Sequence, residues 1–118
     1  MKLTFRRFDL RLVDTWRISS QQGVTQGKDF YPVVFVELQS DRFTGIGEGA
    51  PSTRYNESAD TVQTFLRKVD AARLSFQDIP ASMAYLDSVA PGNYTAKAAI
   101  NLALIDGVAK AAGVQVYD

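Results

Sequence analysis

The chain has 118 residues, of which 46% are hydrophobic and 22% charged, a composition typical of one soluble globular domain. Thirteen basic residues balance thirteen acidic ones, so charge favours neither nucleic acid nor an anionic membrane as a partner. There is no cysteine and no histidine, which excludes disulfides, thiol nucleophiles and Cys/His zinc sites. The sequence has no apolar run near the roughly 20 residues that span a bilayer and no apolar signal-peptide core, so we expect a cytoplasmic protein.

The first half of the chain is predicted to form three strands. Residues 3–16 alternate between apolar and polar, but the phase slips at Arg6-Arg7, which predicts a bulge or a strong twist. A polar loop, Arg17–Asp29, separates this first strand from a second strand in residues 30–39. A tight turn at residues 40–42 then leads to a third strand in residues 43–49. Adjacent strands without helical crossovers pair antiparallel, so the sequence predicts a meander.

The second half is predicted to form helices, which makes the fold α+β with a bundle of three or four helices. An amphipathic stripe predicts a helix over residues 57–72 with Asn56 as its N-cap, and Glu57 near the positive end of its dipole. A shorter helix is expected around residues 79–89, and a long one from Asn93 or Thr95 to Gly113.

The long helix is apolar on nearly every side, which is typical of a helix that is buried on every side. Three strands and two helices cannot surround it, so we expect a further domain or subunit against an alanine-rich face; an alanine-rich core helix in a compact small domain would explain the same pattern. The apolar residues are Ala98, Ala99, Ile100, Leu102, Ala103, Leu104, Ile105, Val108 and Ala109.

The glycine-rich stretch TGIGEGAPSTRYNES, residues 44–58, begins like a phosphate-binding loop. Its third glycine has the wrong spacing for a dinucleotide fingerprint, no βαβ unit follows, and no Gly-Lys-Ser/Thr is present. A nucleotide site is therefore excluded. Gly45 and Gly47 instead indicate a bend or a close approach of another backbone.

Carboxylates and lysines are the candidates for acid/base catalysis, because histidine is absent. Asp106 lies inside an apolar helix and is expected to be a hydrogen-bonded structural carboxylate, while Glu48 stays ambiguous. Lys97 and Lys110 are expected at the surface. No pair of carboxylates has a spacing that indicates a metal site or glycosidase chemistry, so we assign no catalytic and no metal-binding residue to this chain.

Two motifs give the chain a family resemblance. One is Gly-x-Gly-Glu-x-x-Pro followed by an Arg/Tyr loop, residues 45–55; the other is the alanine-rich helix with an internal Asp-Gly, residues 96–107, running into Gly113-x-x-x-Tyr117. In their order and separation they resemble the N-terminal capping domain of the enolase superfamily, in its muconate-lactonizing subgroup. The likeness is strongest to the dipeptide (L-Ala-D/L-Glu) epimerases and covers residues 1–118.

The resemblance implies a meander plus helical bundle that caps a C-terminal (β/α)-barrel. The barrel carries the paired lysines that move an α-proton and the carboxylates that bind Mg²⁺, and it would lie outside residues 1–118. The parent enzyme would be an isomerase that binds Mg²⁺, and the isolated chain would be inactive.

The resemblance also implies that two loops of the cap, Arg17–Asp29 and Ala50–Asn56, select the substrate, expected to be a dipeptide. The implied substrate-binding residues are Ser19, Ser20, Gln21, Arg54 and Tyr55. Epimerases that prefer an acidic second residue place a basic side chain where Gln21 falls, so a different dipeptide stays open as the substrate. The same motifs also fit the lid of a muconate cycloisomerase or o-succinylbenzoate synthase, and the apolar helix fits a stand-alone module that forms a homo-oligomer.

Overall fold

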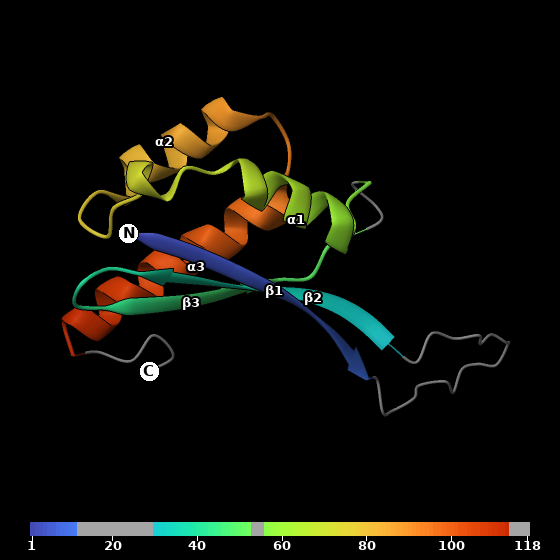
Figure 1. Ribbon diagram of the computed structural model, residues 1–118, viewed down its shortest axis with the longest axis horizontal. Coiled ribbons are helices and arrows are strands. Elements are labelled where there is room, and N and C mark those ends of the chain that lie inside the picture. Colours follow the sequence, from blue (N-terminus) through green and yellow to red (C-terminus); the bar gives the residue numbers. More distant parts are fainter. Residues whose placement is uncertain (12–29, 53–55, 114–118) are drawn as a thin grey trace, which may run out of the picture.

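The computed structural model describes residues 1–11, 30–52 and 56–113. Three strands form one antiparallel sheet in the order β1-β2-β3, with β1 at Lys2–Arg11, β2 at Phe30–Gln39 and β3 at Thr44–Gly49 (Figure 1). The β2–β3 turn is closed by the Ser40 amide, which donates to the Phe43 carbonyl at 2.9 Å. The predicted meander is confirmed.

The phase slip in β1 is accommodated without a bulge. The β1–β2 ladder runs unbroken from Lys2 opposite Gln39 to Arg11 opposite Phe30, and the two strands continue together beyond the end of β3 (Figure 1). Leu3 and Phe5 pack against the core, whereas the Phe8 ring contacts Phe35 on the opposite face with centroids 4.9 Å apart. Each apolar set in β1 therefore has its own face, and a twisted strand rather than a bulged one explains the pattern.

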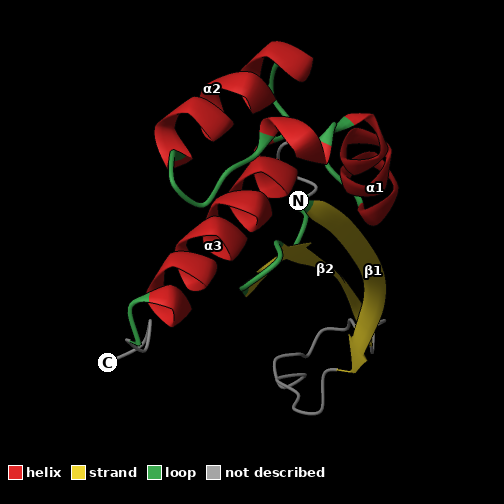
Figure 2. Cartoon of the chain, turned by 60° about the vertical axis from the view of Figure 1, so that its left-hand side comes forward, coloured by secondary structure: helices red, strands yellow, loops and turns green. Residues whose placement is uncertain are grey.

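Three α-helices follow: α1 at Ala59–Lys68, α2 at Ile79–Val89 and α3 at Tyr94–Ala111, with a short 3-10 helix, η4, at Ala71–Arg73. The helices lie together on one side of the sheet, with α3 next to the strands (Figures 1 and 2). The fully buried side chains between the layers come from β2 and all three α-helices, and the largest are Phe65, Leu38, Leu66, Leu86, Ile100 and Leu104.

The start of α1 differs from the prediction. Asn56 is not the N-cap; it has a left-handed backbone with φ of 59°, so it turns the chain before the helix. The N-cap is Ser58, whose hydroxyl accepts from the Thr61 amide while the Thr61 hydroxyl accepts from the Ser58 amide. This reciprocal capping satisfies two backbone donors and fixes the helix start two residues later than the Asn56 cap would have done.

Close packing of α3 on β3 explains the glycines. Gly45, Gly47 and Gly49 point toward α3, and a Cβ atom at Gly47 would overlap the Ala99 carbonyl oxygen and lie 2.8 Å from the Ala103 amide nitrogen. The alanine-rich side of α3 is therefore covered by β3, and the expectation that it is the side lacking a partner is wrong. The prediction of a close backbone approach at Gly45 and Gly47 is confirmed.

Candidate functional site

The five predicted substrate-binding residues fall outside the part of the chain that the structure describes. Ser19, Ser20 and Gln21 belong to the first loop, and Arg54 and Tyr55 belong to the second. Their assignment stays a prediction. What the structure does describe is the strand that follows the first loop and the residues on both sides of positions 53–55 in the second.

The N-terminal end of the second loop is tied to the strand that follows the first loop. The Tyr31 hydroxyl, on the second residue of β2, donates to the Pro51 carbonyl oxygen at 3.2 Å. Pro51 is buried although it lies in a connection. One side chain thus joins the strand that follows the first predicted substrate loop to a described residue of the second.

The C-terminal end of the second loop is tied to α3. The Glu57 carboxylate accepts from the Thr95 amide at 3.3 Å and also from the Thr95 hydroxyl. The prediction that Glu57 stabilises the start of α1 is wrong. Its carboxylate instead lies at the N-terminus of α3, where the Asn93 side chain makes no capping hydrogen bond. A carboxylate there satisfies a free amide and favours the helix dipole.

Two side chains of α3 complete the edge of the sheet along β3. The Ile46 amide donates to the Asp106 carboxylate at 2.9 Å, and the Lys110 ammonium donates to the Thr44 carbonyl at 3.2 Å. Asp106 and Lys110 also form an ion pair at 2.8 Å. Backbone groups that would otherwise be unpaired at a strand edge are thereby satisfied. These contacts give Asp106 the hydrogen-bonded structural role that was expected.

The Asp106 carboxyl should make stability depend on pH. Its partial burial raises the pKa, but hydrogen bonds from Lys110 and the Ile46 amide, with the Lys110 charge, outweigh this and hold the pKa below its usual 3.8. A lowered pKa stabilises the folded chain above pH 3.8, and that contribution is lost as the pH falls through the folded-state pKa.

We therefore expect Asp106→Asn to lower the free energy of unfolding at pH 7 by about 1 kcal/mol, because a charge-assisted bond becomes a neutral one. Urea titrations at successive pH values should show this difference vanishing under acid conditions. Asp41→Asn, an exposed position in the β2–β3 turn, should change stability by less than about 0.5 kcal/mol. A difference that persists unchanged at acid pH would contradict the assigned role of the carboxylate.

The predicted surface position of Lys97 is wrong. Lys97 is only 8% exposed, its ammonium lies 3.0 Å from the Asp87 carboxylate and 5.9 Å from the centroid of the Phe65 ring. Asp87 belongs to α2, which directly precedes α3 in the chain, and Phe65 belongs to α1, so the burial of Lys97 depends on contacts with two other helices. These contacts give Lys97 a structural role between α2 and α3.

One side of α3 is only partly covered by the described residues. Leu102 is 46% exposed, and Ile105 and Val108 are each 40% exposed; we call these three residues the outer stripe. They lie opposite the buried side of the helix, which is formed by Ala96, Ala99, Ile100, Ala103, Leu104 and Gly107. Three large apolar residues in a row on one helix face are typical of a surface that another protein surface covers.

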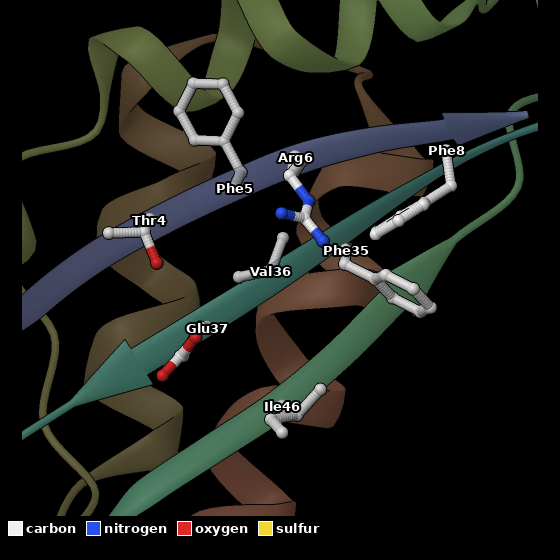
Figure 3. Close-up of a pocket in the computed structure, with 8 residues that line it drawn as sticks. All are labelled: Thr4, Phe5, Arg6, Phe8, Phe35, Val36, Glu37 and Ile46. Atoms are coloured by element: carbon white, nitrogen blue, oxygen red, sulfur yellow. The ribbon is translucent and has the colours of Figure 1, made fainter.

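A shallow open groove of about 600 Å³ crosses the face of the sheet that points away from α3 (Figure 3). Phe8, Phe35 and Ile46 form its apolar part, and the Arg6 guanidinium lies 4.5 Å from the Phe8 centroid. Glu37 lines the same groove on β2. The aromatic rings, one basic side chain and one acidic side chain give this face mixed chemistry.

The described residues do not fit a magnesium site. Across 1–11, 30–52 and 56–113 no three acidic side chains come together as metal ligands, whereas Mg²⁺ needs several oxygen ligands in octahedral geometry. No helix among these residues is both long enough and apolar enough to cross a membrane.

The architecture is that of the small α+β domain found in several larger enzymes. An L-Ala-D/L-Glu epimerase structure superposes with a TM-score of 0.68 over 96% of this chain and 30% of its own, at 22% identity. A mandelate racemase/muconate lactonizing protein from Herpetosiphon aurantiacus gives 0.75 over 94% and 31%, at 17% identity. An enolase family member from Agrobacterium tumefaciens, described as having homology to dipeptide epimerases and as holding sodium and L-Ala-L-Glu with an ordered loop, gives 0.58 over 97% and 31%, at 28% identity.

Residues 11–118 match the family described as mandelate racemase / muconate lactonizing enzyme, N-terminal domain. The chain therefore belongs to this family, within the enolase superfamily. It is 48% identical over 119 residues to an L-Ala-D/L-amino acid epimerase of Pedosphaera parvula, covering 100% of this chain and 34% of that protein. It is 32% identical over 121 residues to an L-Ala-D/L-Glu epimerase of Bacteroides thetaiotaomicron, covering 99% and 30%. The chain thus spans about a third of the length of these relatives.

Proposed function

We propose that residues 1–118 are the substrate-selecting cap of a Mg²⁺-dependent enzyme that moves the α-proton of a dipeptide. The observation that carries the proposal is the 48% identity to an L-Ala-D/L-amino acid epimerase along the whole chain, which spans only 34% of that relative. In this proposal the proton-moving and Mg²⁺-binding groups belong to the remaining part of the parent polypeptide, a barrel that packs on the outer stripe of α3.

The structure supports a division of labour between the cap and the barrel. The uncovered outer stripe, Leu102, Ile105 and Val108, offers an apolar docking surface. The two predicted substrate loops both connect to β2. Arg17–Asp29 precedes β2 in the chain, and the Pro51 carbonyl of the second loop accepts a hydrogen bond from the Tyr31 hydroxyl of β2. A cap of this kind would exclude water and read the distal part of the substrate, and Mg²⁺ held by the barrel would supply electrostatic stabilisation of negative charge.

The substrate class can be tested with the full-length protein, Mg²⁺ and a panel of L-Ala-L-X dipeptides in D₂O. We expect deuterium to enter the α-position of the second residue, as measured by NMR, for dipeptides but not for lactone or cyclohexadiene substrates. Because Gln21 stands where a cation would pair with an acidic side chain, we expect neutral second residues to be turned over faster than glutamate.

Three results would contradict the proposal. Conversion of a lactone or a cyclohexadiene would indicate a cycloisomerase or an o-succinylbenzoate synthase instead. A stable dimer of residues 1–118 that buries the outer stripe, in an organism whose gene encodes no downstream barrel, would indicate an interaction module. Deuterium exchange by residues 1–118 alone would place the chemistry within this chain.

A further inference from the structure

We propose that Tyr31, Glu57 and Thr95 are positioning residues that hold the stem of the second loop, residues 51–52 and 56–57, against β2 and α3. This inference rests on the proposed function, because it concerns how the cap presents its loop to a substrate. It is carried by four hydrogen bonds, each of which joins described residues.

The first bond fixes the N-terminal side of the stem. Tyr31 is 40% exposed, yet its hydroxyl reaches the Pro51 carbonyl at 3.2 Å. Pro51 itself is buried and lies two residues after Gly49, the last residue of β3. The residue that accepts the hydrogen bond is therefore also held by packing. The stem therefore begins from a fixed point on the sheet.

The next bonds fix the C-terminal side. The Glu57 amide donates to the Ser52 carbonyl at 3.1 Å, which closes the neck of the loop. The Glu57 carboxylate, in a residue only 8% exposed, then accepts from the Thr95 amide and the Thr95 hydroxyl. A carboxylate so little exposed is costly without partners, and here its partners stand on the first turn of α3.

The three positioning residues attach the loop stem to the most closely packed part of the domain, where α3 lies on β3. Thr95 lies on the helix that packs backbone to backbone on β3 and carries the outer stripe, so the loop stem is set relative to the proposed docking surface. Loss of an anchor should loosen the stem residues while the reacting groups elsewhere stay intact. Such a change weakens substrate binding more than it slows the proton transfer.

The test uses the full-length protein with Tyr31→Phe, Thr95→Val and the pair Glu57→Ala and Glu57→Gln. Tyr85→Phe is a matched control, because it removes the hydroxyl that accepts from the Asp70 amide at 2.7 Å, a bond between η4 and α2 that does not touch the stem. We expect the three anchor losses to raise KM for the preferred dipeptide about tenfold with kcat within about twofold. Glu57→Gln, which keeps an acceptor oxygen, should recover most of the affinity, and Tyr85→Phe should leave KM unchanged.

A second measurement separates this inference from the proposed function. In residues 1–118 alone, hydrogen exchange of the amide at position 57 should become at least about tenfold faster in Tyr31→Phe and Thr95→Val and stay unchanged in Tyr85→Phe. If the full-length protein turns over no dipeptide, the proposed function fails, and exchange at position 57 alone decides whether the anchors hold the stem. Unchanged exchange, or an unchanged KM in an active enzyme, overturns the positioning role.

Discussion

Gly47→Ala should destabilise the chain by about 3 kcal/mol or more, because the added methyl group would overlap the backbone of α3. The new Cβ would overlap the Ala99 carbonyl oxygen and lie 2.8 Å from the Ala103 amide nitrogen. Both atoms belong to the backbone of α3, so no side chain can rotate away. The helix would have to move off the sheet, which would also disturb the bonds from Ile46 to Asp106 and from Lys110 to Thr44.

Urea unfolding followed by circular dichroism measures this loss as a lower midpoint at an unchanged slope. Gly92→Ala is the matched control, because it makes the same chemical change where no atom lies within 4 Å. Its φ of 65° alone should cost about 1 kcal/mol. Equal losses in the two variants would show that the β3–α3 contact does not depend on glycine.

Leu104→Ala should cost about 2–5 kcal/mol, because it removes a fully buried side chain and leaves a cavity. Leu104 is 0% exposed and lies in the cluster formed by β2, α1, α2 and α3. Other members of the same cluster, Val36, Phe65 and Ile100, are also buried. We therefore expect no exposed side chain to move in and fill the cavity. The measurement is again the free energy of unfolding of residues 1–118.

Leu102→Ala is the control for that variant and should cost less than about 1 kcal/mol in the same chain. This substitution makes the same chemical change on the same helix, two residues away, but at a side chain that is 46% exposed. Helix propensity favours alanine slightly over leucine and offsets part of the lost contact. A loss at Leu102 as large as that at Leu104 would mean that the outer stripe is already covered within the chain.

Alternating apolar residues and local turn signals are enough to predict the three strands and their antiparallel order, and apolar residues at helical spacing are enough to predict the three α-helices. The β1 phase slip is also visible in the sequence, but a bulge and a twist predict the same pattern of residues. The choice between them depends on Phe35, which gives Phe8 a partner on the far face of the sheet. That contact joins two strands across a loop, so β1 alone could not decide it.

Contacts with other helices account for two of the errors, and a local choice between neighbouring capping residues accounts for the third. A lysine on a helix is normally solvated, which predicts Lys97 at the surface, whereas Asp87 and Phe65 from other helices surround it. Local sequence assigns Glu57 to the nearest helix start, while its carboxylate binds Thr95, which is 38 residues further along the chain. Asn56 has the residue type of an N-cap, but Ser58 and Thr61 cap each other.

The candidate site is predicted from family resemblance rather than from spacing, and its five residues lie outside the described part of the chain. The stems of the two loops could not be predicted from local sequence, because Tyr31 and Pro51 are joined across 20 residues. The apolar composition of α3 does predict a surface that packs against another domain or subunit, but it predicts the alanine-rich face as that surface. The alanines pack on the glycines of β3, and the uncovered side instead carries Leu102, Ile105 and Val108.

The proposed cap can be tested most directly by measuring Leu102→Ala in the full-length protein as well as in residues 1–118. Native-state hydrogen exchange of α3 amides reports the local free energy of opening in both forms. If the rest of the polypeptide packs on the outer stripe, the loss should rise from less than about 1 kcal/mol to about 2–4 kcal/mol, the cost of truncating a buried leucine. The same small loss in both forms would contradict the docking of a barrel on α3.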